Sequence, residues 1–193
     1  MPVPKTIEQL QHFLETHEDF GKINGQEVVR VRDDVVELCN IFVTREAYNK
    51  AVLRGTALSF SKSQIATFAL TQFLTDESIY SRQIVPKPAD PGWYTTEFPC
   101  FIPANIYELA CSKAQEINFT ESDLLTYALN LFVSNPGINA IYNAYIEKLC
   151  KQHNVNADYV ELKILGWLKY QARKKRLELS LAAGEFVDRA KLP

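Results

Sequence analysis

CNIFVTREAYNKAVLRGTALSFSKSQIATFALTQFL, residues 39–74, reads as a short strand, a helix, a serine-rich turn and a second helix. The same order returns in residues 99–133, PCFIPANIYELACSKAQEINFTESDLLTYALNLFV. With an offset of 59, residues 41–74 align with 100–133 without a gap. Nine of these thirty-four positions are identical, where average residue usage gives about two. This self-similarity favours two copies of one structural unit. Two unrelated helix pairs would share only the helical spacing of apolar residues and the capping residues.

Each copy is too small to bury its own apolar surface. Period-two alternation places Ile41 and Val43 on one strand face, and likewise Cys100 and Ile102. A lone strand has unpaired edges, and two helices supply only half a core. We therefore expect strand 36–43 to pair antiparallel with strand 95–102, with four helices packed behind this ribbon around a pseudo-twofold axis.

The helices of each copy have recognisable starts and stops. The first helix is expected to open after Thr44, or at Pro103, where a missing N–H costs nothing. It is expected to end near Gly55 in the first copy and near its counterpart Ala114 in the second. The second helix is expected to open at Ser61 or Thr120, each of which can cap free backbone N–H groups.

The chain divides into three parts. Residues 1–35 are expected to form an N-terminal helix (6–16) and a hairpin strand, residues 36–134 the tandem repeats, and residues 135–193 a C-terminal helical extension. The repeats occupy 36–75 and 95–134, joined by a Pro-rich connection at 76–94. The last helix is expected over about residues 157–182. The predicted class is mainly α with a small antiparallel β ribbon, an intramolecular pair of repeats plus additional helices.

Composition bounds the protein class. The chain has 193 residues, 47% hydrophobic content and a net charge of −2, so it has enough apolar residues for a core and no global attraction to polyanions. No run approaches the roughly 20 apolar residues of a membrane span. We expect a cytoplasmic protein without a membrane partner, whose four cysteines are reduced.

The strand, Pro103, the first helix and the Thr120/Ser122 turn of the second copy resemble the ribbon-helix-helix superfamily. Two copies in one chain resemble members that build the usual homodimer within a single polypeptide. The resemblance implies double-stranded DNA as partner: the ribbon enters the major groove, its outward side chains read bases, and the second helix grips phosphate with its N-terminal N–H groups.

The outward ribbon positions depart from the superfamily pattern. They are Leu38, Asn40, Phe42, Glu97, Pro99 and Phe101. Among them only Asn40 is of a type that commonly reads base edges. Phe42 and Phe101 occupy equivalent positions and form an apolar surface, which something is expected to cover. They are the predicted interface for a protein partner or a homodimer.

The two second-helix starts carry different charge. Ser61, Lys62 and Ser63 suit a phosphate, with a cap, a cation and backbone donors. The equivalent turn of the second copy is acidic. Residues 41–74 carry a net charge of +3 and residues 100–133 a net charge of −3, so symmetric DNA binding is not expected.

Two further basic segments are DNA-binding candidates. Arg30 and Arg32 share a strand face beside the ribbon, where charge also protects a solvated edge. The densest cluster lies late in the last helix, where cations also favour the helix C-terminus. Its members are Lys169, Arg173, Lys174, Lys175 and Arg176.

Signatures of catalysis or metal binding are weak. Cys150 and His153 offer two possible ligands where a zinc site needs about four, and no phosphate-cradling glycine motif occurs. Trp167 is expected on an apolar helix stripe with Val160, Ile164 and Leu168. We therefore predict no cofactor and no metal.

The sequence leads to two functional hypotheses. The first is a non-enzymatic DNA-binding protein, a transcriptional or plasmid/phage-type regulator. The second is a protein-interaction or scaffold protein that keeps the fold but has lost base reading.

Overall fold

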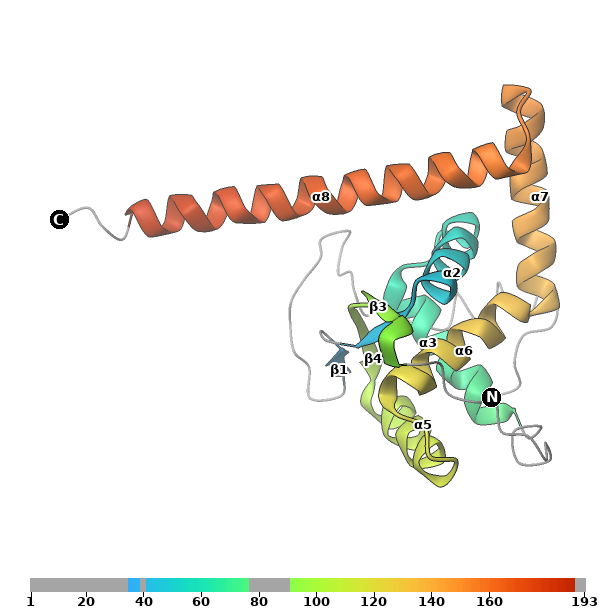
Figure 1. Ribbon diagram of the computed structural model, residues 1–193, viewed down its shortest axis with the longest axis vertical. Helices are drawn as coiled ribbons and strands as arrows, with labels where there is room; N and C mark the ends of the chain where they lie inside the picture. Colours follow the sequence, from blue (N-terminus) through green and yellow to red (C-terminus); the bar gives the residue numbers. More distant parts are fainter. Residues whose placement is uncertain (1–34, 39–40, 77–90, 190–193) are drawn as a thin grey trace. The chain divides into compact units, whose positions relative to one another are not determined.

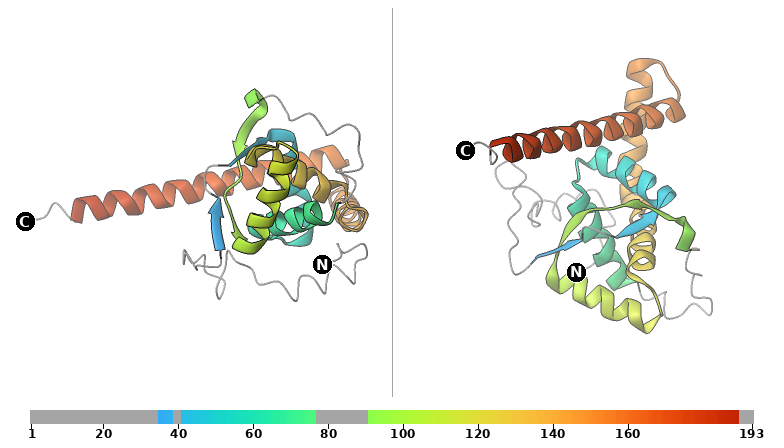
Figure 2. Two further views of the ribbon diagram at one scale, coloured as in Figure 1. Left: turned by 90° about the horizontal axis from the view of Figure 1, so that it is seen from below. Right: turned by 60° about the vertical axis from the view of Figure 1, so that its left-hand side comes forward.

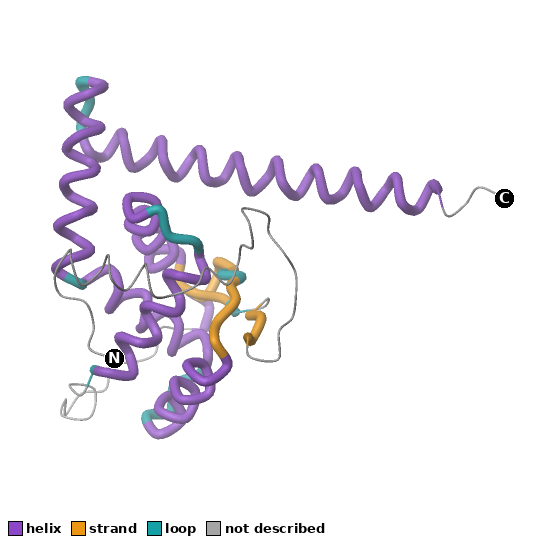
Figure 3. Tube along the Cα trace, turned by 180° about the vertical axis from the view of Figure 1, so that it is seen from behind, coloured by secondary structure: helices purple, strands orange, loops and turns teal. Residues whose placement is uncertain are grey.

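The computed structural model describes residues 35–38, 41–76 and 91–189, which are mainly helical (Figure 1). Their α-helices are α2 (Arg45–Leu58), α3 (Lys62–Thr75), α5 (Ala104–Glu116), α6 (Glu121–Ser134), α7 (Pro136–His153) and α8 (Ala157–Arg189). The strands are β1 (Val35–Leu38), β2 (Phe42–Thr44), β3 (Tyr94–Glu97) and β4 (Cys100–Pro103), with a short 3-10 turn, η1 (Pro91–Trp93), before β3. Figure 3 shows how short the strands are beside the helices. The predicted class, mainly α with a small antiparallel β component, is confirmed. The predicted helix 6–16 and its hairpin lie outside the described residues.

The chain forms two compact units, Met1–Tyr145 and Ile146–Pro193, which divide within α7. The first unit contains both repeats. The second contains the end of α7 and all of α8. No helix in the described parts of the chain is long and apolar enough to cross a membrane.

The strands of the two repeats pair with each other. β1 runs antiparallel to β4, with Leu38 opposite Cys100, and β2 runs antiparallel to β3, with Phe42 opposite Glu97. Between the two ladders the Phe98 N–H donates to the Ile41 carbonyl at 3.0 Å. The predicted antiparallel pairing of strand 36–43 with strand 95–102 is therefore confirmed.

The inward-facing side of the ribbon is largely as predicted. Ile41, Val43, Phe98, Cys100 and Ile102 are all buried. Cys100, expected to be a reduced core residue, is a free thiol. Alternation along each of the two strands places these side chains against the helices.

Leu38 corrects one sequence-based assignment. Simple alternation places it on the outward face, yet it is buried and lies opposite buried Cys100. The pairing register shifts by one residue between the two ladders, since Leu38 pairs with Cys100 whereas Ile41 meets Phe98. A one-residue shift moves a side chain to the other face of a ribbon, which explains the error.

Local capping fixes the helix starts at the predicted residues. The Thr44 hydroxyl accepts the Ala47 N–H, and Pro103 occupies the start of α5 without a side-chain cap. Ser61 and Thr120 each form a capping box: the hydroxyl accepts the backbone N–H of the residue three positions later, and the side chain of that residue accepts the N–H of the capping residue.

The expected end of the first helix near Gly55 is wrong. α2 continues to Leu58 and ends at Ser59, whose φ of 57° is left-handed. Gly55 instead lies against Ile65, where a Cβ atom would be only 3.0 Å from the Ile65 Cγ1 and closer still to its Cδ1. The close approach of these two helices, rather than helix termination, is the reason for a glycine here.

The core lies where α3 and α6 pack against each other behind the strands (Figure 2). The Phe68 and Phe132 rings meet edge to face, with centroids 5.7 Å apart, and the Phe73 and Tyr127 rings do the same at 6.1 Å. Such pairs add about 0.5–1.5 kcal/mol each beyond burial of their area. The two repeats therefore share one interior.

Lys113 and Arg54 are equivalent cations of the two first helices, and only Lys113 directly contacts the end of the other copy's second helix. Lys113, buried in α5, donates from Nζ to the carbonyls of Phe73 (2.7 Å), Leu74 (3.2 Å) and Asp76 (3.0 Å). Arg54 in α2 instead donates to Asn139 at 2.9 Å, and the Asn139 amide donates to the Val133 carbonyl at 2.9 Å. Both arrangements satisfy carbonyls at a helix C-terminus.

Candidate functional site

The outward face of the ribbon is apolar and acidic. Phe42 is 43% exposed and pairs with Glu97, Pro99 is exposed, and Phe101 is half-buried. Two of these residues are aromatic and one is a carboxylate, which phosphate repels. Leu38 does not contribute to this face. The described part of the ribbon therefore lacks the amide and guanidinium groups that read base edges.

The start of α3 is occupied by interactions within the protein. The Ser61 hydroxyl accepts the Gln64 N–H at 3.2 Å, and the buried Ser63 hydroxyl accepts the Phe101 N–H at 3.0 Å. Lys62 Nζ lies 5.1 Å from the centroid of the Tyr48 ring. All three predicted phosphate-binding residues thus have partners within the protein, and the Ser63 hydroxyl joins α3 to β4.

The start of α6 is unsuited to an anion. Asp123 is buried in its capping box, accepts a hydrogen bond from the Thr120 N–H at 2.9 Å and accepts another from the Tyr94 hydroxyl. Glu121 accepts a hydrogen bond from the Tyr107 hydroxyl at 2.6 Å. Two carboxylates at this helix start would repel a phosphate.

Three of the predicted DNA-binding residues, Arg30, Arg32 and Asn40, lie outside the described residues. Within the described residues of the two copies, the residues predicted to contact phosphates or bases therefore do not form a common exposed surface. The remaining predicted residues belong to α8.

Helix α8 exposes a cationic surface. Lys169, Arg173 and Lys174 are all exposed, and Lys175 and Arg176 continue the same helix. Among residues 159–174 the only carboxylate is Glu161. At 100° per residue, Glu161 lies almost opposite Tyr170 on the helix. Within residues 159–174, the side of α8 that carries Tyr170 therefore has no carboxylate.

Aromatic side chains interrupt the cations on this surface. Tyr159, Lys163, Trp167, Tyr170 and Lys174 follow one another at intervals of three or four residues, so each neighbours the next on the helix surface. We call these five residues the α8 stripe; all are exposed. Lys163 Nζ already lies 5.2 Å from the Tyr159 ring centroid.

Trp167 corrects a second assignment. The sequence pattern places it on an apolar stripe with Val160, Ile164 and Leu168, and an apolar stripe is expected to pack, yet Trp167 is 56% exposed while Val160 is buried. Ile164 and Leu168, on the same stripe, are half-buried. In the sequence, Trp167 lies four residues after Lys163 and three before Tyr170. This spacing places it on the same exposed side of the helix as those two residues.

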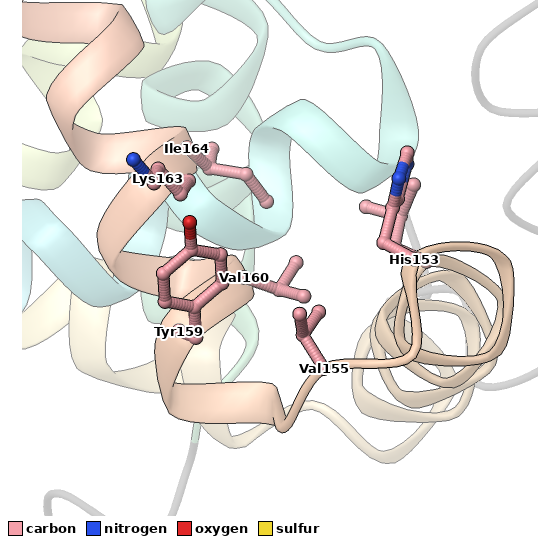
Figure 4. A pocket seen from close by; sticks show the side chains of 7 residues that line it. His153, Val155, Tyr159, Val160, Lys163 and Ile164 are labelled. Carbon is pink, nitrogen blue, oxygen red and sulfur yellow. The ribbon is translucent and has the colours of Figure 1, made fainter.

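A pocket lies at the N-terminal end of the α8 stripe (Figure 4). Its volume is about 470 Å³, within the range of ligand sites. Figure 4 shows the Tyr159 ring beside Lys163, with Val155 and Val160 nearby and His153 across the opening. Leu149 and Ile164 complete the lining. The walls are mainly apolar, and Lys163 and His153 lie on opposite sides of the pocket.

Two neighbouring groups of α5, Tyr107 and Cys111, have raised pKa values. Burial raises the pKa of the Tyr107 phenol, as does its hydrogen bond to Glu121. Burial also raises the pKa of the Cys111 thiol, which keeps it protonated and poorly nucleophilic. No group of three or more histidine, cysteine or carboxylate side chains within the described ranges could hold a metal ion.

Comparison of the chain with protein-family models, with curated proteins and with solved structures gave no match.

Proposed function

We propose that the protein is a non-enzymatic DNA-binding protein, a regulator in which a tandem ribbon-helix-helix core carries a polyanion-contacting helix, α8. The observation that carries this proposal is the exposed cationic surface of α8. It offers Lys163, Lys169, Arg173 and Lys174, and within residues 159–174 the only carboxylate is Glu161. Phosphate contacts by such residues supply most of nonspecific DNA affinity.

The ribbon-helix-helix part of the proposal is supported by packing that repeats at the 59-residue offset. At this offset Phe68 is equivalent to Tyr127, and Phe132 is equivalent to Phe73. The Phe73 and Tyr127 rings form a pair with an interplanar angle of 79°, close to the 78° of the Phe68–Phe132 pair. Left-handed Ser59 (φ 57°) and Asn118 (φ 56°) are likewise 59 apart. Such reciprocal packing is what a twofold arrangement requires.

The ribbon is not the DNA-contacting surface in this proposal. Its described outward residues are aromatic or acidic, and Ser61, Lys62 and Ser63 are engaged internally. The fold serves as the scaffold, and α8 supplies the phosphate-binding cations from one side of the molecule.

A mobility-shift titration on random-sequence duplex DNA tests the proposal. The triple variant Lys169→Gln, Arg173→Gln, Lys174→Gln is expected to bind more weakly at low salt. The slope of log K against log salt should become shallower by about 1 for each phosphate that is no longer neutralised. A matched variant, Lys50→Gln, Lys148→Gln, Lys151→Gln, removes three exposed cations elsewhere and should bind as the wild type does. No binding of the wild type at low salt would refute the proposal.

The exposed ring of Phe42 favours a second candidate function, a protein-interaction module. A large aromatic side chain left 43% exposed beside half-buried Phe101 is typical of an interface residue. In this case the ribbon face would bury both rings in a homodimer. Sedimentation of the wild type over a range of concentrations should then show a dimer that Phe42→Ser dissociates, without any change in DNA affinity.

A further inference from the structure

The α8 stripe combines two kinds of side chain in one row. Tyr159 is 47% exposed, Trp167 56% and Tyr170 62%, and Lys163 and Lys174 lie between or beside them. Over the 15 steps from Tyr159 to Lys174 the row extends about 22 Å along the helix. Lys169 and Arg173 flank the row one turn apart. A ligand lying along it would meet flat rings and positive charges in turn.

There is room beside these rings for a flat group. Nothing lies within 4 Å of the position that a Cβ atom on Gly166 would occupy, one helix turn before Tyr170. At the other end of the row, Tyr159 and Lys163 form part of the pocket of about 470 Å³ (Figure 4). An aromatic ring could therefore pack in the pocket or beside Tyr170 while a linked anion meets a lysine.

The order of the side chains distinguishes between possible ligands. A helix that lies in a membrane surface separates its apolar face from its charged face, whereas here rings and cations share one face. A DNA duplex offers phosphates but keeps its bases stacked inside, out of reach of exposed rings. Unstacked bases of a single strand present both a π face and a phosphate at each step.

We propose that the α8 stripe binds single-stranded nucleic acid, with bases stacked on Trp167, Tyr170 and Tyr159 and phosphates held by the adjacent lysines and Arg173. This inference rests on the proposed function, because it names the substrate class of the same cationic surface. It adds a preference for single strands over duplexes.

Trp167 itself can report the interaction. The chain has two tryptophans, Trp93 and Trp167, so the variant Trp93→Phe leaves Trp167 as the only indole. We expect an oligothymidylate of about 12 nucleotides, a length within the site sizes of single-strand binders, to quench its fluorescence. The oligonucleotide should bind at least tenfold more tightly than a duplex of the same length. Equal or weaker binding of the oligonucleotide would overturn the inference.

Substitutions separate stacking from charge. Trp167→Ala is expected to weaken oligothymidylate binding by about 5- to 150-fold, the range for loss of one stacked base, with little effect on the duplex. Trp167→Phe should retain most of the affinity. Leu162→Ala removes an apolar side chain that is 67% exposed but lies off the stripe, and should change neither affinity. Unchanged single-strand affinity in Trp167→Ala would overturn the inference.

The same experiments distinguish this inference from the proposed function. If duplex binding depends on Lys169, Arg173 and Lys174 while the single strand binds no better, only the inference fails. If neither nucleic acid binds at low salt, both fail. Vesicles of phosphatidylglycerol and phosphatidylcholine test whether the stripe binds a membrane surface instead. A blue shift of Trp167 emission with vesicles, without quenching by the oligonucleotide, would assign the stripe to membranes and overturn the inference.

Discussion

Gly55 and Ile65 approach so closely that a Cβ atom on Gly55 would lie 3.0 Å from the Ile65 Cγ1 and nearer still to its Cδ1. Both residues are buried, and they join α2 to α3 just before and after the turn at Ser59. The equivalent positions of the second copy are Ala114 and Leu124. There the larger alanine replaces glycine, and its neighbour is leucine, which branches at Cγ rather than at Cβ as isoleucine does.

We expect Gly55→Ala to destabilise the protein by about 1–3 kcal/mol, the usual cost of overpacking a core. Ile65→Val removes the Cδ1 that the new methyl group would meet, so the double variant should recover part of this loss. Urea unfolding of the two single variants and the double variant measures the coupling. Strictly additive effects would contradict the proposed clash.

Thr67 and Thr126 offer a matched test of a buried hydroxyl. Thr126 Oγ1 accepts the Thr44 N–H at 3.4 Å, whereas buried Thr67 Oγ1 has no hydrogen-bond partner among the described residues. The residue equivalent to Thr44 is Pro103, which has no N–H to donate. Thr67→Val should therefore stabilise the protein, by up to about 1 kcal/mol, because it removes an unsatisfied buried polar group.

Thr126→Val is the control for this prediction. It leaves the Thr44 N–H without its acceptor and should cost about 1 kcal/mol. Thermal unfolding measures the change in stability of both variants. Equal changes of the same sign would contradict the proposal that only the Thr126 hydroxyl makes a stabilising hydrogen bond.

Lys113 stabilises the end of α3 from within the core. Its ammonium group donates to three carbonyls at 2.7–3.2 Å and lies 5.1 Å from the Phe73 ring centroid. Lys113→Met should cost about 2–3 kcal/mol, because carbonyls at the helix end lose a charged donor. Exposed Lys148 provides the comparison, since Lys148→Met is expected to change stability by less than about 0.5 kcal/mol. Similar urea midpoints for the two variants would contradict this role.

Tyr107 predicts a pH dependence at the alkaline end. Burial and the hydrogen bond to Glu121 raise its pKa above the ordinary value of 10.0. The folded protein therefore holds this proton more tightly than the unfolded chain, so the contribution to stability is complete below the unfolded-state pKa and is lost as pH rises above it.

The measurement compares the wild type with Tyr107→Phe, which cannot ionise. The stability advantage of the wild type over this variant should shrink between about pH 9 and pH 11, a range that spans the ordinary pKa of tyrosine. Urea midpoints at several pH values give the difference, and a constant difference across this range would rule out the raised pKa.

Features that depend on neighbouring residues were predictable from the sequence. The caps at Thr44, Ser61 and Thr120 are local, because each hydroxyl reaches an N–H three residues later. The burial of Phe98, Cys100 and Ile102 follows from strand alternation. The pairing of the two strands follows from the incompleteness of each copy.

Features set by long-range interactions were not predictable. The shift between the two ladders buries Leu38, although simple alternation turns it outward. Lys113 is buried because three carbonyls converge on it from the end of α3. Ser63 looks available to phosphate in the sequence, yet its hydroxyl accepts the N–H of Phe101 in β4.

The pairing of β2 with β3 has a consequence for the order of events during translation. β2 ends at Thr44, and its partner strand begins at Tyr94. At about 5–20 residues per second, synthesis of the intervening chain takes roughly 3–10 seconds. Phe68 and Phe73 are made during that interval, whereas Phe132 and Tyr127, the rings that pack on them, are made only after it. The ribosome-bound chain should therefore be a client for chaperones until its second half emerges.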